Sequence, residues 1–390
     1  MSSFNDLIAE YCPDGVTFKR LGDIVRIKNG KDHKALGDGE FPVYGSGGIM
    51  RYADTYTYNK PSVLIPRKGS LGNLFFVDVP FWNVDTIFYT EIDEAQILPK
   101  FLYYFLTTAG LGEMNQAGGV PSQTQSVLNE LKIPVPPFEV QDEIVRFLDS
   151  FAELTAELTA ELTARKKQYN YYRDQLLSFE EGDVEWKSLG DVTKKWYSGG
   201  TPTAGNPEYY DGGDIPWLRT QEVKFSDIES TEIKITQKAL EKSAAKWIPA
   251  NCVIIAISGA TAGRSAINKI PLTTNQHCGC LEIDSTKALY RYVFHWVSFN
   301  YENIKALGQG ARGDLNSSII KGFALPIPYA DDPEKSLAEQ ARIVAILDKF
   351  DALTNSLTEG LPREIELRQK QYEHYRDLLL SFPKQAEVTG

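Results

Sequence analysis

The sequence predicts a mixed α/β (α+β) protein made by tandem duplication, in which two globular bodies are joined by two long helices forming an antiparallel coiled coil. Three observations support this fold class. Two segments recur about 200 residues apart, both have the spacing of apolar residues expected of a helix, and the stretches between them alternate short β-rich runs with Gly-rich turns.

The repeat is clearest in the two helical segments. Gln141–Thr155 aligns with Glu339–Thr354 at an offset of 199, and Arg165–Phe179 aligns with Arg368–Phe382 at an offset of 203, with 11 of 15 positions identical. The second copy is therefore four residues longer. Fainter repeats in the bodies pair Val16–Ile24 with Val184–Val192, Val63–Asn73 with Val253–Arg264, and Leu131–Pro137 with Phe323–Tyr329.

These repeats divide the chain into four parts. We expect a first globular domain over residues 1–138, a central helical spacer over 139–182, a second globular domain over 183–329 and a C-terminal helical spacer over 330–390. The expected strands of the bodies are the runs SVLIP, LFFVDV, TIFYTEI, CVIIAIS and CGCLEI, and the expected helices are FLYYFLTT and ALYRYVFHWVSF.

The central spacer has a heptad stripe of apolar residues, and neither Gly nor Pro occurs between Glu139 and Phe179. About 41 residues are therefore free to form one unbroken helix, roughly 60 Å long. The C-terminal spacer has a similar stripe, but Gly360 and Pro362 predict a break or kink. The simplest partner for either stripe is the other one, in an antiparallel arrangement.

The tetrapeptide Ala-Glu-Leu-Thr occurs three times in succession over Ala152–Thr163. Four residues advance a helix by about 6 Å and turn it by about 400°, so the apolar face nearly returns to register. The spacer can therefore change length without losing its seam. Slippage of a short DNA repeat would explain the origin of the tandem, whereas the adjustable length describes its consequence, so the two explanations are compatible.

The net charge of −11 is unevenly distributed. Residues 91–190 and 331–390 carry −9 and −4, whereas residues 1–90 and 191–330 carry 0 and +2. The acidity lies mainly in the helical parts and the stretches leading into them, so it does not exclude a nucleic-acid ligand for the bodies.

Composition indicates a cytoplasmic globular protein. Of the residues, 42% are hydrophobic and 24% charged, and no run of 18 apolar residues occurs. The N-terminal residues lack the basic and apolar regions of a secretory signal. We expect the four cysteines to be reduced thiols.

No catalytic or metal site is predicted. Val135–Phe138 is similar to the Asn/Asp-Pro-Pro-Tyr/Phe motif of DNA amino-methyltransferases, but valine replaces the polar residue that would hold the target amine. Gly259–Ser265 is one residue short of a P-loop and has no lysine. His277–Cys280 lacks a fourth zinc ligand at a recognisable spacing. We therefore expect a non-enzymatic chain with no cofactor of its own.

Side chains suited to nucleic-acid recognition gather in turn-like stretches of both bodies. Arg, Lys, Gln and Asn read base edges, and Lys, Ser and Thr contact phosphates. The candidates in the first body are Tyr44, Ser46, Arg51, Lys60, Arg67, Lys68, Gln123 and Gln125. Those in the second body are Arg219, Thr220, Gln221, Arg264, Gln276, His277, Gln309, Arg312, Asn316 and Ser317.

Any one of these residues is readily explained as a solvated loop residue, so the argument rests on the group. The frame of the bodies repeats, as Gly69 matches Gly259 and Pro42 matches Pro216, while the loops differ. One scaffold with two different reading surfaces suggests two different half-sites.

Over essentially its whole length the chain resembles the specificity (S) subunits of type I restriction–modification enzymes. The resemblance depends on the body–helix–body–helix layout, the two QxxIVxxLDxF openings, the Ala-Glu-Leu-Thr tandem, the two RxKQYxxYRDxLLSF blocks, and the LGD and GGTP segments, the latter at Gly199–Pro202.

This resemblance implies that the bodies are target recognition domains, each binding one half of a split, asymmetric site in double-stranded DNA. It also implies that the helices set the gap and dock two modification subunits, which form an adenine-N6 methyltransferase using S-adenosylmethionine. Restriction subunits that use ATP and Mg²⁺ would join for cleavage. The residues expected to form the spacer and its docking surface are Phe151, Leu158, Leu162, Tyr169, Tyr172, Arg173, Phe350, Leu357, Tyr372, Tyr375 and Arg376.

Two alternatives remain open at this stage. One is a stand-alone bipartite DNA-binding adaptor or a homodimeric regulator. The other is a structural coiled-coil protein with ligand-binding bodies, which the acidic balance favours.

Overall fold

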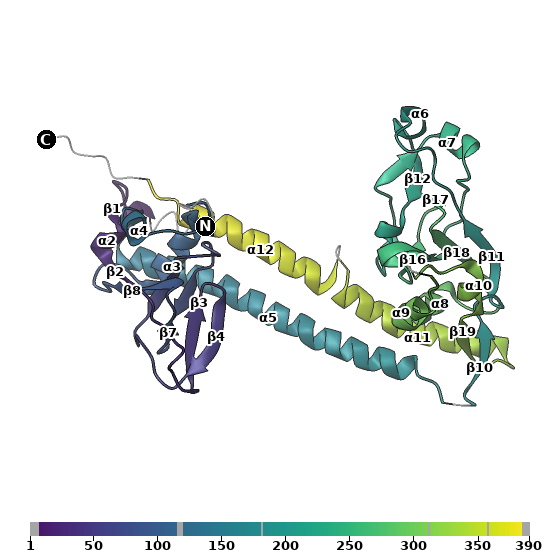
Figure 1. The fold of residues 1–390 in the computed structure, drawn as a ribbon, viewed down its shortest axis with the longest axis horizontal. Coiled ribbons are helices and arrows are strands. Elements are labelled where there is room, and N and C mark those ends of the chain that lie inside the picture. Colours follow the sequence, from purple (N-terminus) through teal and green to yellow (C-terminus); the bar gives the residue numbers. More distant parts are fainter. Residues whose placement is uncertain (1–7, 115–119, 181, 311–312, 357–358, 384–390) are drawn as a thin grey trace. The chain divides into compact units, whose positions relative to one another are not determined.

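The computed structural model describes residues 8–114, 120–180, 182–310, 313–356 and 359–383 of the chain (Figure 1). The chain divides into two compact units. The first combines Met1–Ala160 with Glu364–Gly390, and the second consists of Glu161–Arg363. Each unit therefore contains one globular body together with parts of both helical segments.

The first body contains a four-stranded sheet in the order β2-β8-β5-β6, a three-stranded sheet in the order β4-β3-β7, and the antiparallel pair β1-β9 (Figure 1). The strands are β1 (Phe18–Arg20), β2 (Val25–Lys28), β3 (Phe41–Gly45), β4 (Gly48–Ala53), β5 (Ser62–Pro66), β6 (Phe75–Val77), β7 (Trp82–Asn83), β8 (Ile87–Ile92) and β9 (Lys132–Pro134). The helical elements are α2 (Leu21–Ile24), α3 (Pro99–Thr108), the 3₁₀ turn η1 (Leu111–Glu113) and α4 (Gln125–Asn129).

The core of this body forms around β5, whose five residues are all buried. A short continuous apolar run suits a strand covered on both faces. On one face Val63 and Ile65 pack with Phe101 and Leu102 of α3, while Leu64 belongs to a separate cluster on the other face.

The second body repeats this plan, with sheets in the orders β11-β18-β15-β16-β13, β14-β12-β17 and β10-β19 (Figure 1). The strands are β10 (Val184–Ser188), β11 (Thr193–Ser198), β12 (Ile215–Leu218), β13 (Asp227–Ile228), β14 (Ile233–Ile235), β15 (Val253–Ala256), β16 (Ser265–Asn268), β17 (Thr273–Thr274), β18 (Cys278–Ile283) and β19 (Ala324–Pro328). The helical elements are α6 (Pro207–Tyr210), η2 (Thr220–Glu222), α7 (Gln237–Lys242), η3 (Gly259–Thr261), α8 (Tyr290–Phe299), α9 (Tyr301–Ala306) and α10 (Ser317–Gly322).

The shared sheet order confirms the duplication of the bodies. In both, a central strand (β5 or β15) pairs antiparallel with its two sheet neighbours, and β3 and β12 each pair antiparallel with one strand and parallel with another. The predicted strand and helix runs of both bodies are also confirmed. The second body differs by the added strand β13, which pairs in parallel with β16.

The long helices are α5 (Phe138–Leu176), α11 (Pro333–Thr354) and α12 (Gly360–Leu379). Helix α5 is continuous, as predicted, but ends three residues before Phe179. Its threonines are accommodated by bonding back along the helix, since the Thr155 hydroxyl donates to the Phe151 carbonyl oxygen at 2.8 Å.

The predicted interruption of the C-terminal spacer is present, but it precedes Gly360 and does not lie at Pro362. Helix α11 ends at Thr354, and Gly360, with φ = +79°, begins α12. An added Cβ at Gly360 would lie 2.3 Å from the Ala352 carbonyl oxygen, so glycine is needed at this turn. Pro362 lies in the first turn of α12, where proline is tolerated because that N–H has no intrahelical partner.

The helices pack antiparallel within each unit, as predicted. In the first unit Phe147 and Phe151 of α5 contact Tyr375 of α12 at ring-centroid distances of 5.5 and 5.7 Å. Further along α12, Leu379 belongs to the core cluster that includes Ile144, which precedes Phe147 on α5. The two helices therefore run in opposite directions. None of the helices in the described ranges is long and apolar enough to cross a membrane.

The second unit has the reciprocal contact. Tyr172 of α5 stacks on Phe350 of α11 with centroids 5.5 Å apart. Phe350 aligns with Phe151, and Tyr172 aligns with Tyr375. Each unit therefore pairs the first part of one helical repeat with the last part of the other.

Candidate nucleic-acid interface

The loops predicted to bind DNA in the first body meet at one end of its four-stranded sheet. The Arg67 backbone N–H, directly after β5, donates to the Thr86 carbonyl oxygen before β8. The Gln123 N–H donates in turn to the Arg67 carbonyl oxygen, and the Gly69 N–H donates to that of Pro121. Three segments distant in sequence are thereby held together.

The tip of the β3–β4 hairpin joins the same cluster. The Asn73 side-chain amide donates to the Ser46 carbonyl oxygen at 3.4 Å, and an added Cβ at Gly69 would lie 3.4 Å from the Ser46 hydroxyl. Gln125 adds another segment, because its amide donates to the Asn29 side-chain oxygen at 3.3 Å.

The second body holds equivalent loops with the same backbone pattern. The Ile257 N–H, after β15, donates to the His277 carbonyl oxygen, and the Leu315 N–H donates to the Ile257 carbonyl oxygen. The Asn275 N–H donates to the Leu218 carbonyl oxygen, just as the Val84 N–H donates to that of Tyr44 in the first body. The two bodies thus present corresponding loops.

The side chains on these equivalent loops differ between the bodies. In the second body the Thr201 hydroxyl donates to the Gln276 side-chain oxygen at 2.7 Å, and the Ser258 hydroxyl lies 2.7 Å from His277 Nδ1. Gln276 and His277 are both exposed. The sequence did not mark Thr201, Ser258 or the first body's Asn73 as DNA contacts, because their place in the cluster depends on the fold.

Several predicted residues have structural partners. Gln123 is 2% exposed and its amide donates to the Pro66 carbonyl oxygen at 2.6 Å. The Asn316 side chain accepts from the Ile319 N–H at 3.0 Å and caps α10. Tyr44 packs its ring against Phe75, and burial raises the pKa of its hydroxyl.

Two arginines on the predicted list are paired with carboxylates. Arg51 donates to Asp38 at 2.7 Å, and Arg219 bonds to Glu222 and Glu232. Lys60 lies before β5 and Arg67 after it, so Lys60 is at the far end of this strand from the loop cluster. Arg312 lies outside the described residues.

The remaining predicted residues lie on the cluster or beside it. Lys68 is exposed in the loop after β5, and Arg67 lies 5.9 Å from the centre of the Phe88 ring. Arg264 follows η3, and the backbone of Gln309 pairs with that of Asp314. Thr220 and Gln221 lie in η2, and Ser317 begins α10.

The cysteines of the second body are core residues. Cys252, Cys278 and Cys280 are fully buried in one apolar cluster, and burial raises the pKa of Cys278 to about 12. Such thiols stay protonated and are poor metal ligands. Within the described residues, which include all four cysteines, no disulfide occurs and no group of three His, Cys, Asp or Glu could hold a metal ion.

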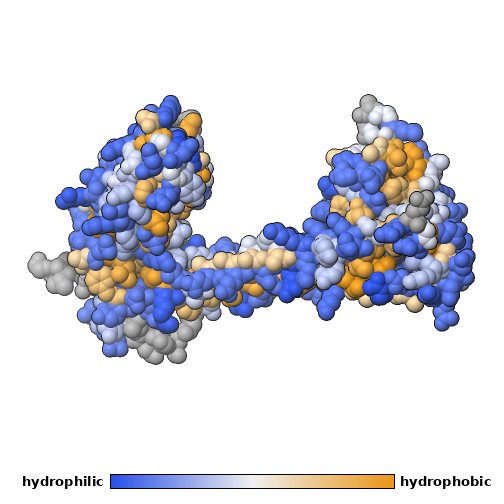
Figure 2. All heavy atoms as spheres, turned by 90° about the horizontal axis from the view of Figure 1, so that it is seen from below, coloured by the Kyte–Doolittle hydropathy of each residue, from blue (hydrophilic) through white to orange (hydrophobic). Residues whose placement is uncertain are grey.

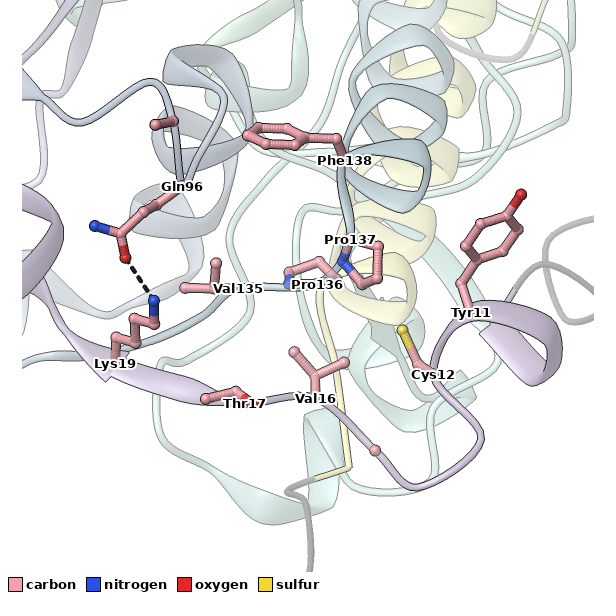
Figure 3. A pocket seen from close by; sticks show the side chains of 12 residues that line it. Tyr11, Cys12, Val16, Thr17, Lys19, Gln96, Val135, Pro136, Pro137 and Phe138 are labelled. Carbon is pink, nitrogen blue, oxygen red and sulfur yellow. Dashed lines mark hydrogen bonds between the residues drawn. The ribbon is translucent and has the colours of Figure 1, made fainter.

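A pocket of about 440 Å³ lies on the first body, away from the loop cluster, between β1 and the segment that leads into α5 (Figure 3). Tyr11, Cys12 and Pro136 line it, and Lys19 bonds across it to Gln96. Of the predicted DNA-binding residues that the structure describes, none borders this pocket.

The predicted spacer residues that the structure describes include aromatic side chains at which the long helices pack. Arg173 lies 5.8 Å from the centre of the Tyr169 ring and Arg376 lies 5.9 Å from that of Tyr372, so the two repeats have matching cation–π pairs. Burial raises the pKa of Tyr169 to about 12. Leu158 and Leu162 are half-buried, and Leu357 lies outside the described residues.

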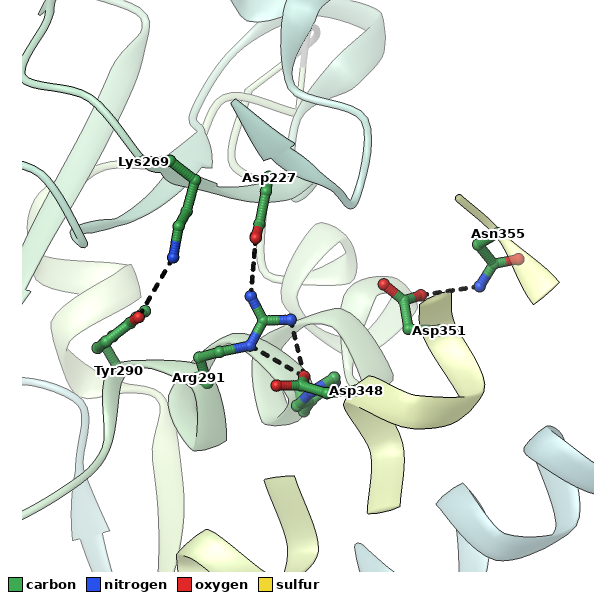
Figure 4. Close-up of polar contacts among 8 residues, drawn as sticks. Asp227, Lys269, Tyr290, Arg291, Asp348, Asp351 and Asn355 are labelled. Atoms are coloured by element: carbon green, nitrogen blue, oxygen red, sulfur yellow. Dashed lines mark hydrogen bonds and ion pairs between the residues drawn. The ribbon is translucent and has the colours of Figure 1, made fainter. Parts of the chain in front are cut away.

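A polar network fastens the second body to α11 (Figure 4). Asp348 of α11 accepts from Arg291 at 2.7 Å and lies 2.6 Å from His295 Nε2, both on α8. Arg291 also bonds to Asp227 at the start of β13. Burial alone would raise the pKa of Asp348, but the bonds with His295 and Arg291 outweigh it and hold this pKa below its usual value.

The first unit has a matching contact. Asp149 of α5, which aligns with Asp348, accepts from Lys100 at 2.6 Å and from the Tyr104 hydroxyl at 2.5 Å. Burial, and next the bond to Asp149, raise the pKa of Tyr104. Both helical repeats therefore have an aspartate at this position, but the side chains that bond to it differ between the two units.

The chain contains two copies of one body, and each copy is attached to paired helices. The two copies present equivalent loops with different side chains, which is the arrangement of a tandem recognition protein. The chain belongs to the family described as type I restriction modification DNA specificity domain, whose family model matches residues 13–165 and 181–367.

Two curated relatives illustrate this membership. The chain is 44% identical over 314 residues to the specificity subunit of the type I restriction enzyme EcoR124I/EcoR124II of Escherichia coli, covering 77% of this chain and 75% of that one. It is 30% identical over 390 residues to a putative type I restriction enzyme specificity subunit of Haemophilus influenzae, covering 94% and 96% of the two chains.

Solved structures share the fold at low sequence identity. The type I restriction–modification S subunit of M. genitalium has a TM-score of 0.63 at 16% identity, covering 95% of this chain and 96% of that one. A chain from a structure describing assembly and conformational transition of a type I restriction–modification system has a TM-score of 0.55 at 14% identity, covering 94% and 98%. The predicted fold class and family are thus confirmed, and with them the prediction of a recognition subunit that is not an enzyme.

Proposed function

We propose that this chain is the DNA sequence-specificity subunit of a type I restriction–modification enzyme, in which each body reads one half of a bipartite, asymmetric site. The observation that carries this proposal is the pair of equivalent loop clusters with different side chains: Ser46, Lys68 and Asn73 in one body, and Arg264, Gln276 and His277 in the other. Equivalent loops with different side chains suit two different half-sites.

The proposed contacts fall into two kinds. Exposed amides and imidazoles such as Gln276 and His277 match base edges, whereas Lys68 and Ser46 match phosphate oxygens. Gln123, Asn316 and Tyr44 act in this proposal as supports for the loops, because their side chains are engaged within the body.

The helices serve in this proposal as spacer and docking surface. Two modification subunits would bind them and form an adenine-N6 methyltransferase, with S-adenosylmethionine in those subunits. Any ATP and Mg²⁺ would belong to restriction subunits. The continuity of α5 through the tandem repeat supports a spacer of defined length. Because the ligand is cellular DNA, the expected compartment is the cytoplasm.

Long-read methylome sequencing tests the proposal directly. Cells that carry this chain with its cognate modification subunit are compared with cells lacking only this chain. We expect a split motif with methyladenine on both strands that disappears when the chain is absent. If both proteins fold and associate but no new methylated motif arises, the subunit assignment is wrong. Binding of a defined bipartite site by the chain alone would then favour the adaptor.

A further inference from the structure

The β3–β4 hairpin of the first body carries an exposed apolar surface. Ile49, Met50 and Tyr52 are 49%, 57% and 51% exposed, and all three lie on β4. This strand is at the edge of its sheet, which has the order β4-β3-β7. Figure 2 shows hydrophobic residues as patches on an otherwise largely hydrophilic surface. Three exposed apolar side chains on one short edge strand call for a ligand.

A β-bulge directs one of these side chains. Val43 pairs with Arg51 and Tyr44 pairs with Ile49, so Met50 is the additional residue on β4. A bulge increases the local twist and re-aims the side chain that it carries. The Met50 sulfur lies over Gly45. A Cβ added to Gly45 would be only 2.7 Å from this sulfur, so the methionine side chain fits here because residue 45 is glycine.

The basic residue of the same strand is bonded within the body. Arg51 Nη2 donates to Asp38 at 2.7 Å and to the carbonyl oxygens of Leu36 and Gly37 at 3.2 Å. The guanidinium group is therefore engaged by the segment before β3. The exposed large side chains of β4 that remain for a ligand are therefore apolar.

The surroundings of the hairpin indicate that this ligand is DNA. Its tip touches the loop after β5 through Ser46 and Asn73, and that loop carries Lys68, whose ammonium group has no ion-pair partner within the described residues. A lysine beside a narrow apolar strand complements phosphates that flank bases. The major groove of B-DNA is wide enough for a two-stranded β-ribbon, and the C5-methyl group of thymine is the apolar group displayed there.

We propose that Met50 contacts a thymine C5-methyl group in the major groove, so that the half-site read by the first body includes a thymine recognised by apolar contact. This inference rests on the proposed function. It assigns the contact to a residue that the sequence did not indicate, since an exposed methionine has no base-reading signature until its place beside the loop cluster is known.

The test replaces thymine with deoxyuridine, which keeps base pairing and removes only the methyl group. The complex of this chain with its modification subunits is titrated with duplexes in which each thymine of the first half-site is replaced in turn. We expect one position to weaken binding about three- to five-fold, the value for losing contact with one methyl group. In the Met50→Ala complex, duplexes with thymine and with deoxyuridine at that position should bind with closely similar affinities.

Val79→Ala is the matched control, since Val79 is 47% exposed but follows β6 at the far end of β5 from the loop cluster. This variant should keep the full sensitivity to deoxyuridine. A half-site without thymine, or unchanged affinity at every replaced position while specific binding persists, would overturn the inference and leave the proposed function intact. Hairpin variants that bind the site normally but no longer assemble with the modification subunit would identify a protein contact instead. Failure of the wild-type complex to bind any defined site would count against the proposed function itself.

Discussion

Gln141 and Gln340 occupy equivalent positions near the starts of the two helical repeats and make the same contact. Gln141 Oε1 accepts from the Leu98 backbone N–H at 2.7 Å, and Gln340 Oε1 accepts from the Leu289 N–H at 2.9 Å. Both leucines directly precede a helix of the body, α3 or α8, and lack a capping side chain of their own. Each body is thus joined to its long helix through a buried amide.

Replacing either glutamine should destabilise its unit. Gln141→Ala or Gln340→Ala leaves a backbone N–H without its acceptor in the interior, which costs about 1–3 kcal/mol. Denaturant unfolding measures this change. Gln369→Ala on α12 is the control, because Gln369 is exposed and its amide donates to Glu373 one helical turn further along. If Gln340→Ala unfolds at the same denaturant concentration as Gln369→Ala, the buried contact does not stabilise the unit.

The Asp348 network should make the second unit sensitive to acid. Because the folded-state pKa of Asp348 is lowered below its ordinary 3.8, this carboxylate stabilises the fold fully above that value and loses its contribution as pH falls through the lowered pKa. Asp348→Asn should therefore lower the melting temperature at pH 6 and reduce its decline between pH 5 and 3. Asp351→Asn, three residues further along α11, controls for the loss of one negative charge. Parallel pH profiles for wild type and Asp348→Asn would contradict this role.

The repeated framework was predictable from the sequence because apolar spacing determines which faces are buried. The heptad stripe located the helices, and buried runs such as Ser62–Pro66 located the central strands. Gly360 and Pro362 together predicted the break. Gly360 does lie where α12 begins, whereas Pro362 does not interrupt that helix because the first turn accepts proline.

The candidate interface was predictable as a set of loops but not residue by residue. Residue type alone could not show that Gln123 is buried or that Arg51 is bonded to Asp38, because both facts depend on segments brought together by the sheets. For the same reason the apolar strand bearing Met50 was missed. Residue type identifies polar side chains that could bind DNA, whereas only the fold shows which of them are already bonded within the protein.

Lys68 should contact a phosphate without reading sequence. Lys68→Ala should weaken binding to cognate and unrelated duplexes by similar factors and reduce the slope of log K against log salt by about 0.9. Lys60→Ala is the matched control, since Lys60 lies at the far end of β5 from the cluster. Binding isotherms from 50 to 300 mM salt measure the slope. A change confined to the cognate duplex would identify Lys68 as a base-reading residue.

The tandem repeat should set the length of the unread gap in the DNA site. The boundary between the two units falls inside Ala152–Thr163, within the continuous helix α5. Deleting one Ala-Glu-Leu-Thr unit removes about 6 Å of helix and leaves the apolar face about 40° from its former register. Since base pairs are about 3.4 Å apart, the methylated motif should keep both half-sites while its gap shortens by one or two base pairs.

A shorter deletion separates the effect of length from that of helix register. Removing only Glu157 and Leu158 turns the following apolar residues by about 200°, so their stripe faces away from the partner helix. That variant should lose methylation and thermal stability and should not produce a shortened motif. Methylome sequencing of both deletions distinguishes the cases, and an unchanged gap in the four-residue deletion would show that the helix does not measure the spacing.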